Sequence, residues 1–220
     1  MIDLLDFARG PALQVSIGIF VLGVTWRLIR LALMPKAVIP SAPREHSVPL
    51  FMGGIHEIFR KMLPNKTFAK RTMFSFINGW VFHLGLLIVV LGLGAHIMFI
   101  KHLTGLSWPN LPSNLVFLVA VITLMSLVAA LVHRLTSPVL RLISTADDYF
   151  TWFVTTLPIV TGLAATMHLG ARYELLLAVH ILSICLFLIW FPFGKLMHSF
   201  LVFATRGKTG MEMARRGVKL

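Results

Sequence analysis

Long apolar runs, separated by shorter stretches that hold most of the prolines and charged residues, make up most of this sequence. A helix needs roughly 20 mainly apolar residues to cross a hydrocarbon core of about 30 Å. Five runs reach that length, near residues 11–34, 74–100, 114–132, 149–169 and 173–204. The pattern therefore predicts an all-α protein, an integral membrane bundle of five transmembrane helices.

The remaining segments fit one membrane domain over residues 1–220, with a long loop at 35–72 and a tail at 205–220. Within the loop, the mixture of apolar and basic residues at 54–62 predicts a short amphipathic helix on the membrane surface. A docking surface for a cytoplasmic partner is a second interpretation, compatible with the first. A solvated basic linker is the third.

The composition excludes an ordinary soluble domain. Hydrophobic residues make up 57% of the chain, charged residues only 13%, and the mean hydropathy is +0.86. Soluble domains carry about 25% charged residues. The single cysteine, Cys185, excludes an intrachain disulfide and a cysteine-ligated iron–sulfur cluster.

The net charge of +12 is distributed unequally between the loops. When successive loops are assigned to alternate sides of the membrane, seventeen Lys and Arg residues fall on one side and three on the other. The three are Arg9, Lys101 and Arg172. The positive-inside rule then predicts an N-terminus outside and a C-terminus in the cytoplasm. Topology and contact with membrane lipid explain the basic charge, so no nucleic-acid partner is expected.

Four of the nine histidines lie within the second and fifth predicted helices, namely His83, His96, His180 and His198. An ionisable side chain at membrane depth is costly and marks a functional candidate. Neutral imidazole ligates iron, and imidazoles on facing helices can hold a haem between them. Because the two helices run in opposite directions, His83 is level with His198 and His96 with His180.

The angular positions of these histidines around their helices test the proposed ligand pairs more strictly. His180 and His198 are eighteen residues apart, which returns to the same face of an ideal helix. His96 follows His83 by thirteen residues, which leaves the two about 140° apart. Gly92 and Gly94 precede His96 and can allow local unwinding. His168 is the alternative outer ligand.

At the fifth predicted helix, the run from His180 to His198 includes Phe191-Pro192-Phe193-Gly194-Lys195-Leu196. It resembles the last helix of the dihaem cytochrome b (gamma) subunit of respiratory nitrate reductases. Phe82-His83-Leu84-Gly85 is similar to the start of that family's second helix. The loop between the third and fourth helices is also similar, through Arg134-Leu-Thr-Ser137-Pro138 and Thr145-Ala-Asp147-Asp148.

The resemblance implies two haem b groups, an inner one held by His83 and His198 and an outer one held by His96 and His180. It further implies that the chain is the quinol-oxidising subunit of a respiratory oxidoreductase. Electrons would then pass from the quinone pool to an iron–sulfur subunit at the cytoplasmic face, with the terminal reaction on a further catalytic subunit. The expected location is the bacterial or archaeal cytoplasmic membrane.

Two features depart from the nitrate reductase pattern. That family's second helix-two histidine comes ten residues after the first, where this chain has Leu93, and the loop before the helix is longer here. Related membrane subunits serve complexes whose cytoplasmic partner resembles heterodisulfide reductase, including those linked to dissimilatory sulfite reduction. Lys101 and His102 are the quinone-binding candidates. The alternative function is a non-redox membrane anchor or assembly subunit, in which the histidines only pack.

Overall fold

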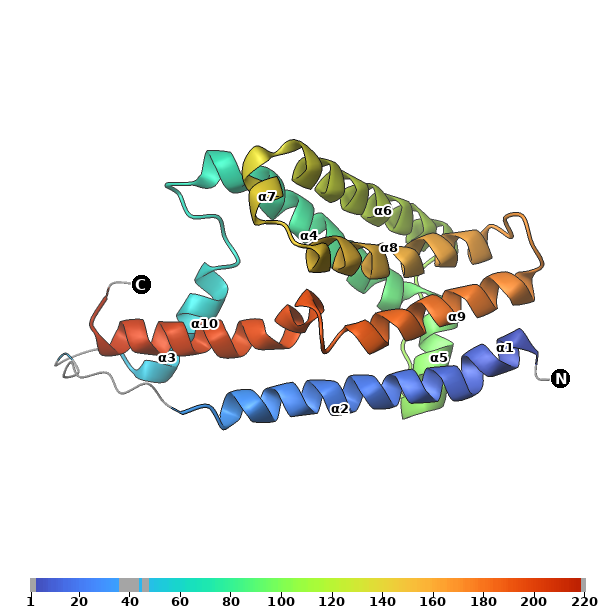
Figure 1. Cartoon of the computed structure of the whole chain (residues 1–220), viewed down its shortest axis with the longest axis horizontal. Coiled ribbons are helices and arrows are strands. Elements are labelled where there is room, and N and C mark those ends of the chain that lie inside the picture. Colours follow the sequence, from blue (N-terminus) through green and yellow to red (C-terminus); the bar gives the residue numbers. More distant parts are fainter. Residues whose placement is uncertain (1–2, 36–43, 45–47, 219–220) are drawn as a thin grey trace. The chain divides into compact units, whose positions relative to one another are not determined.

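A computed structural model describes residues 3–35, 44 and 48–218, and within them the chain is all-helical (Figure 1). The α-helices and two shorter helical turns follow in the order α1 (Leu4–Phe7), the π-helical turn η1 (Ala8–Ala12), α2 (Leu13–Ala32), α3 (Leu50–Arg60), α4 (Ala69–Gly92), α5 (Gly94–Thr104), α6 (Ser113–Thr136), α7 (Pro138–Ile143), α8 (Ala146–Thr166), α9 (Tyr173–Trp190), the 3-10 turn η2 (Lys195–Met197) and α10 (His198–Arg215). The predicted all-α class is confirmed for the described residues.

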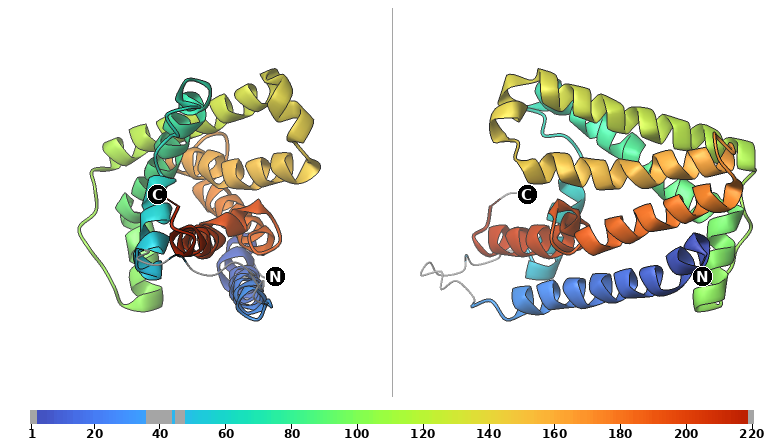
Figure 2. Two further views of the ribbon diagram at one scale, coloured as in Figure 1. Left: turned by 90° about the vertical axis from the view of Figure 1, so that its left-hand side faces the viewer. Right: turned by 45° about the vertical axis from the view of Figure 1, so that its right-hand side comes forward.

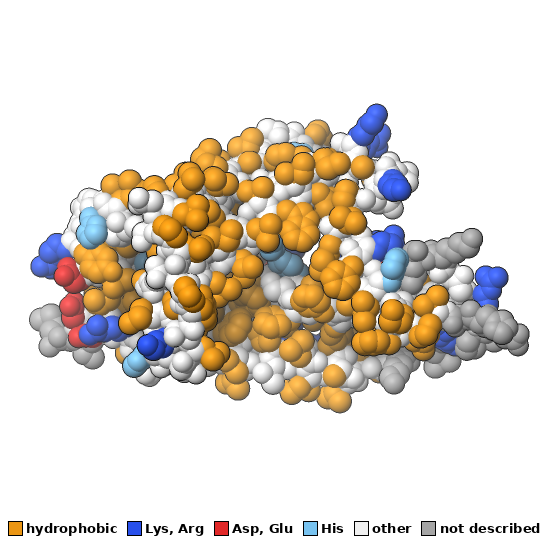
Figure 3. Space-filling model, turned by 180° about the vertical axis from the view of Figure 1, so that it is seen from behind, with side chains coloured by type: hydrophobic (Ala, Val, Ile, Leu, Met, Phe, Trp, Pro, Cys, Tyr) orange, Lys and Arg blue, Asp and Glu red, His pale blue; other side chains and the backbone are white. Residues whose placement is uncertain are grey.

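Five helical segments are long and apolar enough to cross a membrane, namely Leu4–Ala32, Ala69–Gly92, Ser113–Thr136, Ala146–Thr166 and Tyr173–Trp190. Large apolar side chains along them are exposed, as at Leu22, which is 73% exposed. On the face drawn in Figure 3, hydrophobic side chains cover much of the visible surface and Lys and Arg lie toward its margins. Large exposed apolar side chains in such number indicate contact with lipid. The chain is therefore a multi-pass membrane protein.

The chain forms two compact units. The first comprises residues 1–17 and 74–189, and the second comprises residues 18–73 and 190–220. The first unit contains most of four membrane-capable helices, whereas the second contains the helical pair α3 and α10.

Polar side chains and one glycine join neighbouring helices in the first unit. Ser126 of α6 donates from Oγ to Oδ1 of Asn78 of α4 at 3.0 Å, and Asn78 Nδ2 donates back to the Ser126 carbonyl at 3.1 Å. A Cβ at Gly85 would collide with the Thr123 side chain, so these helix backbones pass close together. Trp152 of α8 donates to the Leu127 carbonyl at 2.8 Å. Small residues and interhelical hydrogen bonds of this kind hold membrane helices together.

The second predicted helix, 74–100, is interrupted in the structure. Leu93 has extended backbone angles (φ −76°, ψ 126°), and it separates α4 from α5. Trp108 Nε1 donates to the Leu91 carbonyl at 2.6 Å, and Leu111 N donates to the Gly92 carbonyl at 3.0 Å. These donors satisfy carbonyls that a helix end leaves without an intrahelical partner. The predicted unwinding beside Gly92 and Gly94 is confirmed.

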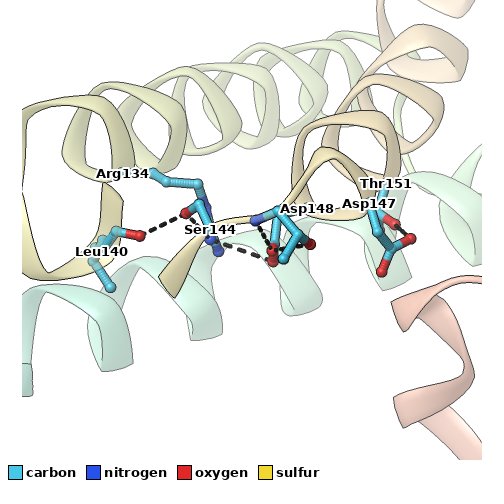
Figure 4. Close-up of polar contacts among 7 residues, drawn as sticks. Arg134, Leu140, Ser144, Asp147, Asp148 and Thr151 are labelled. Atoms are coloured by element: carbon cyan, nitrogen blue, oxygen red, sulfur yellow. Dashed lines mark hydrogen bonds and ion pairs between the residues drawn. The ribbon is translucent and has the colours of Figure 1, made fainter. Parts of the chain in front are cut away.

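The corner between α6 and α8 is held by a compact set of polar contacts (Figure 4). Arg134 donates to Ser144 Oγ at 2.8 Å and pairs with Asp148 at 3.3 Å. The Asp148 side chain also accepts from the backbone N–H and the hydroxyl of Thr145, which caps the start of α8. This cap explains why α8 begins at Ala146. The sequence pattern had placed that start near residue 149.

The expectation of one continuous helix over 173–204 is wrong. Helix α9 ends at Trp190, the segment Phe191–Gly194 is a turn, and the chain resumes in η2 and α10. Pro192 lacks the N–H that a helix needs and its ring clashes with the preceding turn. His180 and His198 therefore lie on separate helices, and the argument from a shared helical face no longer applies. Because α10 continues to Arg215, the expected tail at 205–220 is largely helical.

Glycines allow α3 and α10 to pack closely in the second unit. A Cβ at Gly53 would lie 2.8 Å from the Gly210 carbonyl oxygen, and one at Gly54 would lie 3.1 Å from the Gly207 carbonyl oxygen. The two backbones are thus almost in contact, as Figure 2 shows for the cyan and dark red helices. The described part of the loop 35–72 contains a helix with bounds Leu50–Arg60, where the sequence pattern had placed a short helix at 54–62.

Candidate functional site

Two of the predicted ligands, His96 of α5 and His180 of α9, lie together in the first unit. Their ring centres are 6.3 Å apart, and the ring planes differ by 19°. A metal–imidazole bond is about 2 Å long and the ring centre lies about 1 Å beyond the nitrogen. Two imidazoles on opposite sides of one metal ion therefore have ring centres about 6 Å apart. The observed separation fits this arrangement.

The Nδ1 atom of His96 is held by the interruption between α4 and α5. It lies 3.0 Å from the Val89 carbonyl oxygen, in the last turn of α4. Because a carbonyl can only accept, Nδ1 carries the proton, and Nε2 is the nitrogen with a lone pair. A metal-binding histidine is oriented by such a contact to its other nitrogen.

His180 is held by Thr161 of α8. Its Nδ1 lies 3.2 Å from Thr161 Oγ1, and that hydroxyl lies 2.8 Å from the Leu157 carbonyl and 3.2 Å from the Pro158 carbonyl, both of which can only accept its proton. Ser183 donates to the His180 carbonyl at 2.6 Å and lies 3.0 Å from Thr161 Oγ1. With the Thr161 proton used in this way, Nδ1 of His180 is the donor, and Nε2 has the lone pair.

Gly162 allows the His180 ring to lie against α8. A Cβ at Gly162 would be 3.1 Å from Cε1 and 3.3 Å from Nδ1 of His180. A larger residue would push the ring away from Thr161. Thr161, Gly162 and Ser183 were not among the sequence-predicted site residues. The adjacent Thr161-Gly162 pair was the only available signal, since it places a hydroxyl and a gap together on a neighbouring helix.

The inner ligands, His83 and His198, belong to different units, and each has its own local support. His83 Nδ1 lies 2.6 Å from the Gly79 carbonyl oxygen. His198 Nδ1 lies 2.8 Å from the Lys195 carbonyl oxygen. Both carbonyls accept, so Nδ1 carries the proton in each case. All four predicted ligands thus share the tautomer in which Nε2 can bind a metal.

The alternative outer ligand, His168, lies elsewhere in the first unit. Its ring stacks on Tyr173, with centres 5.3 Å apart, and its backbone is left-handed (φ 54°) just after α8. The structure thus brings His96, and not His168, to His180. Lys101 and His102, the quinone candidates, are exposed on α5.

The described residues contain no group of three or more His, Cys, Asp or Glu side chains placed to hold a bare metal ion. Structural zinc sites use four protein ligands, whereas a porphyrin supplies its own equatorial donors. The two Nε2 atoms of His96 and His180 match in number the two protein ligands that a haem iron can take. When bound, the haem would be held by these Nε2 atoms.

The fold and the paired histidines define a multi-pass helical membrane protein with a candidate haem-binding site in its first unit. No family model and no solved structure matches the chain. A protein of Nitratidesulfovibrio vulgaris strain Hildenborough, described only as "Protein", is 31% identical over 224 aligned positions. The match covers 96% of this chain and 94% of that protein. The chain therefore belongs to the same family as that Nitratidesulfovibrio vulgaris protein.

Proposed function

We propose that this protein is the dihaem cytochrome b subunit of a respiratory membrane complex. In this role it passes electrons between the quinone pool and a cytoplasmic iron–sulfur subunit, while a further subunit carries the terminal reaction. The observation that carries the proposal is the His96–His180 pair, whose ring centres are 6.3 Å apart. The spacing and the shared tautomer both favour an iron that brings its own equatorial donors.

The chain's contribution is to bind and orient, while haem supplies one-electron redox chemistry when bound. Val89 and Thr161 fix the outer imidazoles, and Gly79 and Lys195 fix the inner ones. His96 and His180 would hold one haem through their Nε2 atoms, and His83 and His198 would hold the other.

The orientation of the subunit follows from charge. The seventeen-to-three distribution of basic residues supports an N-terminus outside and a C-terminus in the cytoplasm of a bacterium or archaeon. His96 and His180 then lie toward the outer face and His83 and His198 toward the inner face. Quinol oxidation near the outer pair, beside Lys101 and His102, releases protons outside while electrons move inward. That separation builds a transmembrane potential.

A reduced-minus-oxidised visible spectrum of the purified protein tests the proposal. We expect a b-type signal, with two haems per chain by pyridine haemochrome assay. His180→Ala and His96→Ala should each remove one haem, whereas the matched control His168→Ala should keep both. Absence of any b-type signal would instead support a non-redox anchor subunit, and loss of a haem in His168→Ala would overturn the outer ligand pair.

A further inference from the structure

Helix α3 presents two different faces. Gly53, Gly54 and the buried Glu57 face α10. At about 100° per residue, Phe51, Met52, Ile55 and Phe59 gather on the opposite side of the helix. Phe51 is 72% exposed, Met52 54% and Phe59 63%. With eleven residues, α3 is too short to cross a membrane, so its apolar face is not explained as part of a transmembrane helix.

The charge around this face has one sign. Glu57 is the single acidic residue of the segment 48–68. Its side chain is only 1% exposed and is neutralised by Arg60, whose Nε and terminal nitrogen donate at 2.7 and 2.9 Å. Lys61 also pairs with Glu57, at 3.9 Å, with half of its side chain exposed, and Lys66 is exposed in the segment that follows α3. The surface that accompanies the apolar face is therefore basic, and it is complementary to anionic phospholipid headgroups.

The chain itself keeps α3 close to the bilayer. Helices α2 and α4, on either side of α3 in the sequence, are both membrane-capable, so both ends of the connecting segment return to the same membrane surface. Only eight residues, 61–68, separate the end of α3 from the start of α4. A short tether gives the apolar face a high effective concentration at that surface.

We propose that α3 is an interfacial anchor that inserts its Phe51, Met52 and Phe59 face into an anionic membrane surface. Lys61 and Lys66 contact headgroup phosphates, and the glycine face of α3 fixes α10 at the same surface. The favoured occupant is lipid, because the basic rim matches anionic headgroups and the tether already delivers the face to the bilayer. This inference does not depend on haem binding.

Spin labels on the full-length protein in lipid vesicles test this anchor. The native thiol, Cys185, is buried and is replaced in the background variant Cys185→Ala. Phe51→Cys and its matched control His56→Cys then carry the label. The two positions are five residues apart, which places them about 140° apart around α3. Both are exposed, so neither label enters the α3–α10 contact.

Depth is measured from the relative accessibility of each label to oxygen and to a water-soluble nickel chelate. In vesicles that contain phosphatidylglycerol, we expect the label at residue 51 about 5–10 Å below the phosphates, and the label at 56 at or above them. The double variant Lys61→Glu with Lys66→Glu should reduce the depth at 51. Equal access of the nickel chelate to both labels would overturn the anchor. Equal depth in purely zwitterionic vesicles would overturn the contact with anionic headgroups. Protection of residue 51 that appears only when a partner protein is added would show a protein-docking surface instead.

Discussion

Two helix interruptions in this protein each precede a predicted haem ligand, and they are built differently. The interruption at Leu93 precedes His96 and depends on distant donors, since Trp108 and Leu111 satisfy the exposed carbonyls of α4. The interruption at Phe191–Gly194 precedes His198 and is closed locally. There the N–H groups of Phe193 and Gly194 both donate to the Trp190 carbonyl at 3.0 Å.

The difference shows how an interrupted helix can hold a ligand in two ways. In the first, the Val89 carbonyl in the last turn of α4 is the partner of His96 Nδ1, so the end of α4 orients the ring. In the second, the turn leads into η2, and Lys195 of that short 3-10 turn supplies the carbonyl that orients His198. A break that relies on a distant loop should be sensitive to changes in that loop. A locally closed break should be sensitive to its own small residues.

The largest effect is expected at the local break, from Gly194→Ala. A Cβ at residue 194 would lie 2.8 Å from Cε2 of the Trp190 indole, too close for a rigid ring that has to move as a whole. We expect a loss of about 1–3 kcal/mol in stability and preferential loss of the haem ligated by His198. Haem retention on heating in detergent measures both.

Gly18→Ala is the matched control for that variant. A Cβ at Gly18 meets nothing within 4 Å, and its place inside α2 favours alanine by up to about 1 kcal/mol. Its haem retention should therefore equal or exceed that of the parent protein. If Gly194→Ala retains its haems as well as Gly18→Ala does, the turn at 191–194 tolerates a side chain and the local closure is less tight than described.

The distant closure is tested by Trp108→Phe, with a smaller expected effect. The change removes the indole N–H that donates to the Leu91 carbonyl. An unsatisfied carbonyl lowers stability by about 1–3 kcal/mol when it is buried, and by less at this exposed site. The outer haem should be lost first on heating, because His96 follows this break. Trp26→Phe is the control, since Trp26 is 62% exposed on α2. Preferential loss of the inner haem would contradict the link between the loop and His96.

The two breaks also show what the sequence can and cannot predict. Apolar run lengths predicted all five membrane-capable segments, because a bilayer imposes a length that is visible in composition. Pro192 and Gly194 signalled the second break, yet the eighteen-residue spacing of His180 and His198 was taken as evidence for one continuous helix. Glycines beside Leu93 correctly predicted the first break.

The residues that position the histidines were harder to predict from the sequence than the histidines themselves. A histidine within a long apolar run stands out in the sequence. Burial of its ionisable side chain in the membrane costs free energy, which implies a role. Thr161 is nineteen residues from His180, and Trp108 is seventeen residues from Leu91. Their roles arise from helix packing, and threonine and tryptophan are common in membrane helices and loops for other reasons. The pairing of His96 with His180 needed the same packing, together with the break at Leu93 that separates α5 from α4.

The smallest expected effect is electronic, and it concerns the support that Thr161 gives His180. Thr161→Val keeps the shape of the side chain and removes the hydroxyl that accepts from Nδ1. An oriented hydrogen bond makes the imidazole a more basic ligand, which favours ferric iron, so its removal should raise the midpoint potential of the outer haem. One hydrogen bond is worth about 1 kcal/mol, on the order of 40 mV for one electron.

A redox titration followed by visible spectroscopy measures this shift, and Thr161→Ser is the control that keeps the hydroxyl. The inner haem should be unchanged in both variants, since His83 and His198 take their partners from Gly79 and Lys195. A shift of both haems would indicate a general change in packing. A shift in Thr161→Ser equal to that in Thr161→Val would show that the methyl group, and not the hydroxyl, positions His180. An unchanged outer potential in Thr161→Val would leave α8 with only a steric role, through the gap at Gly162.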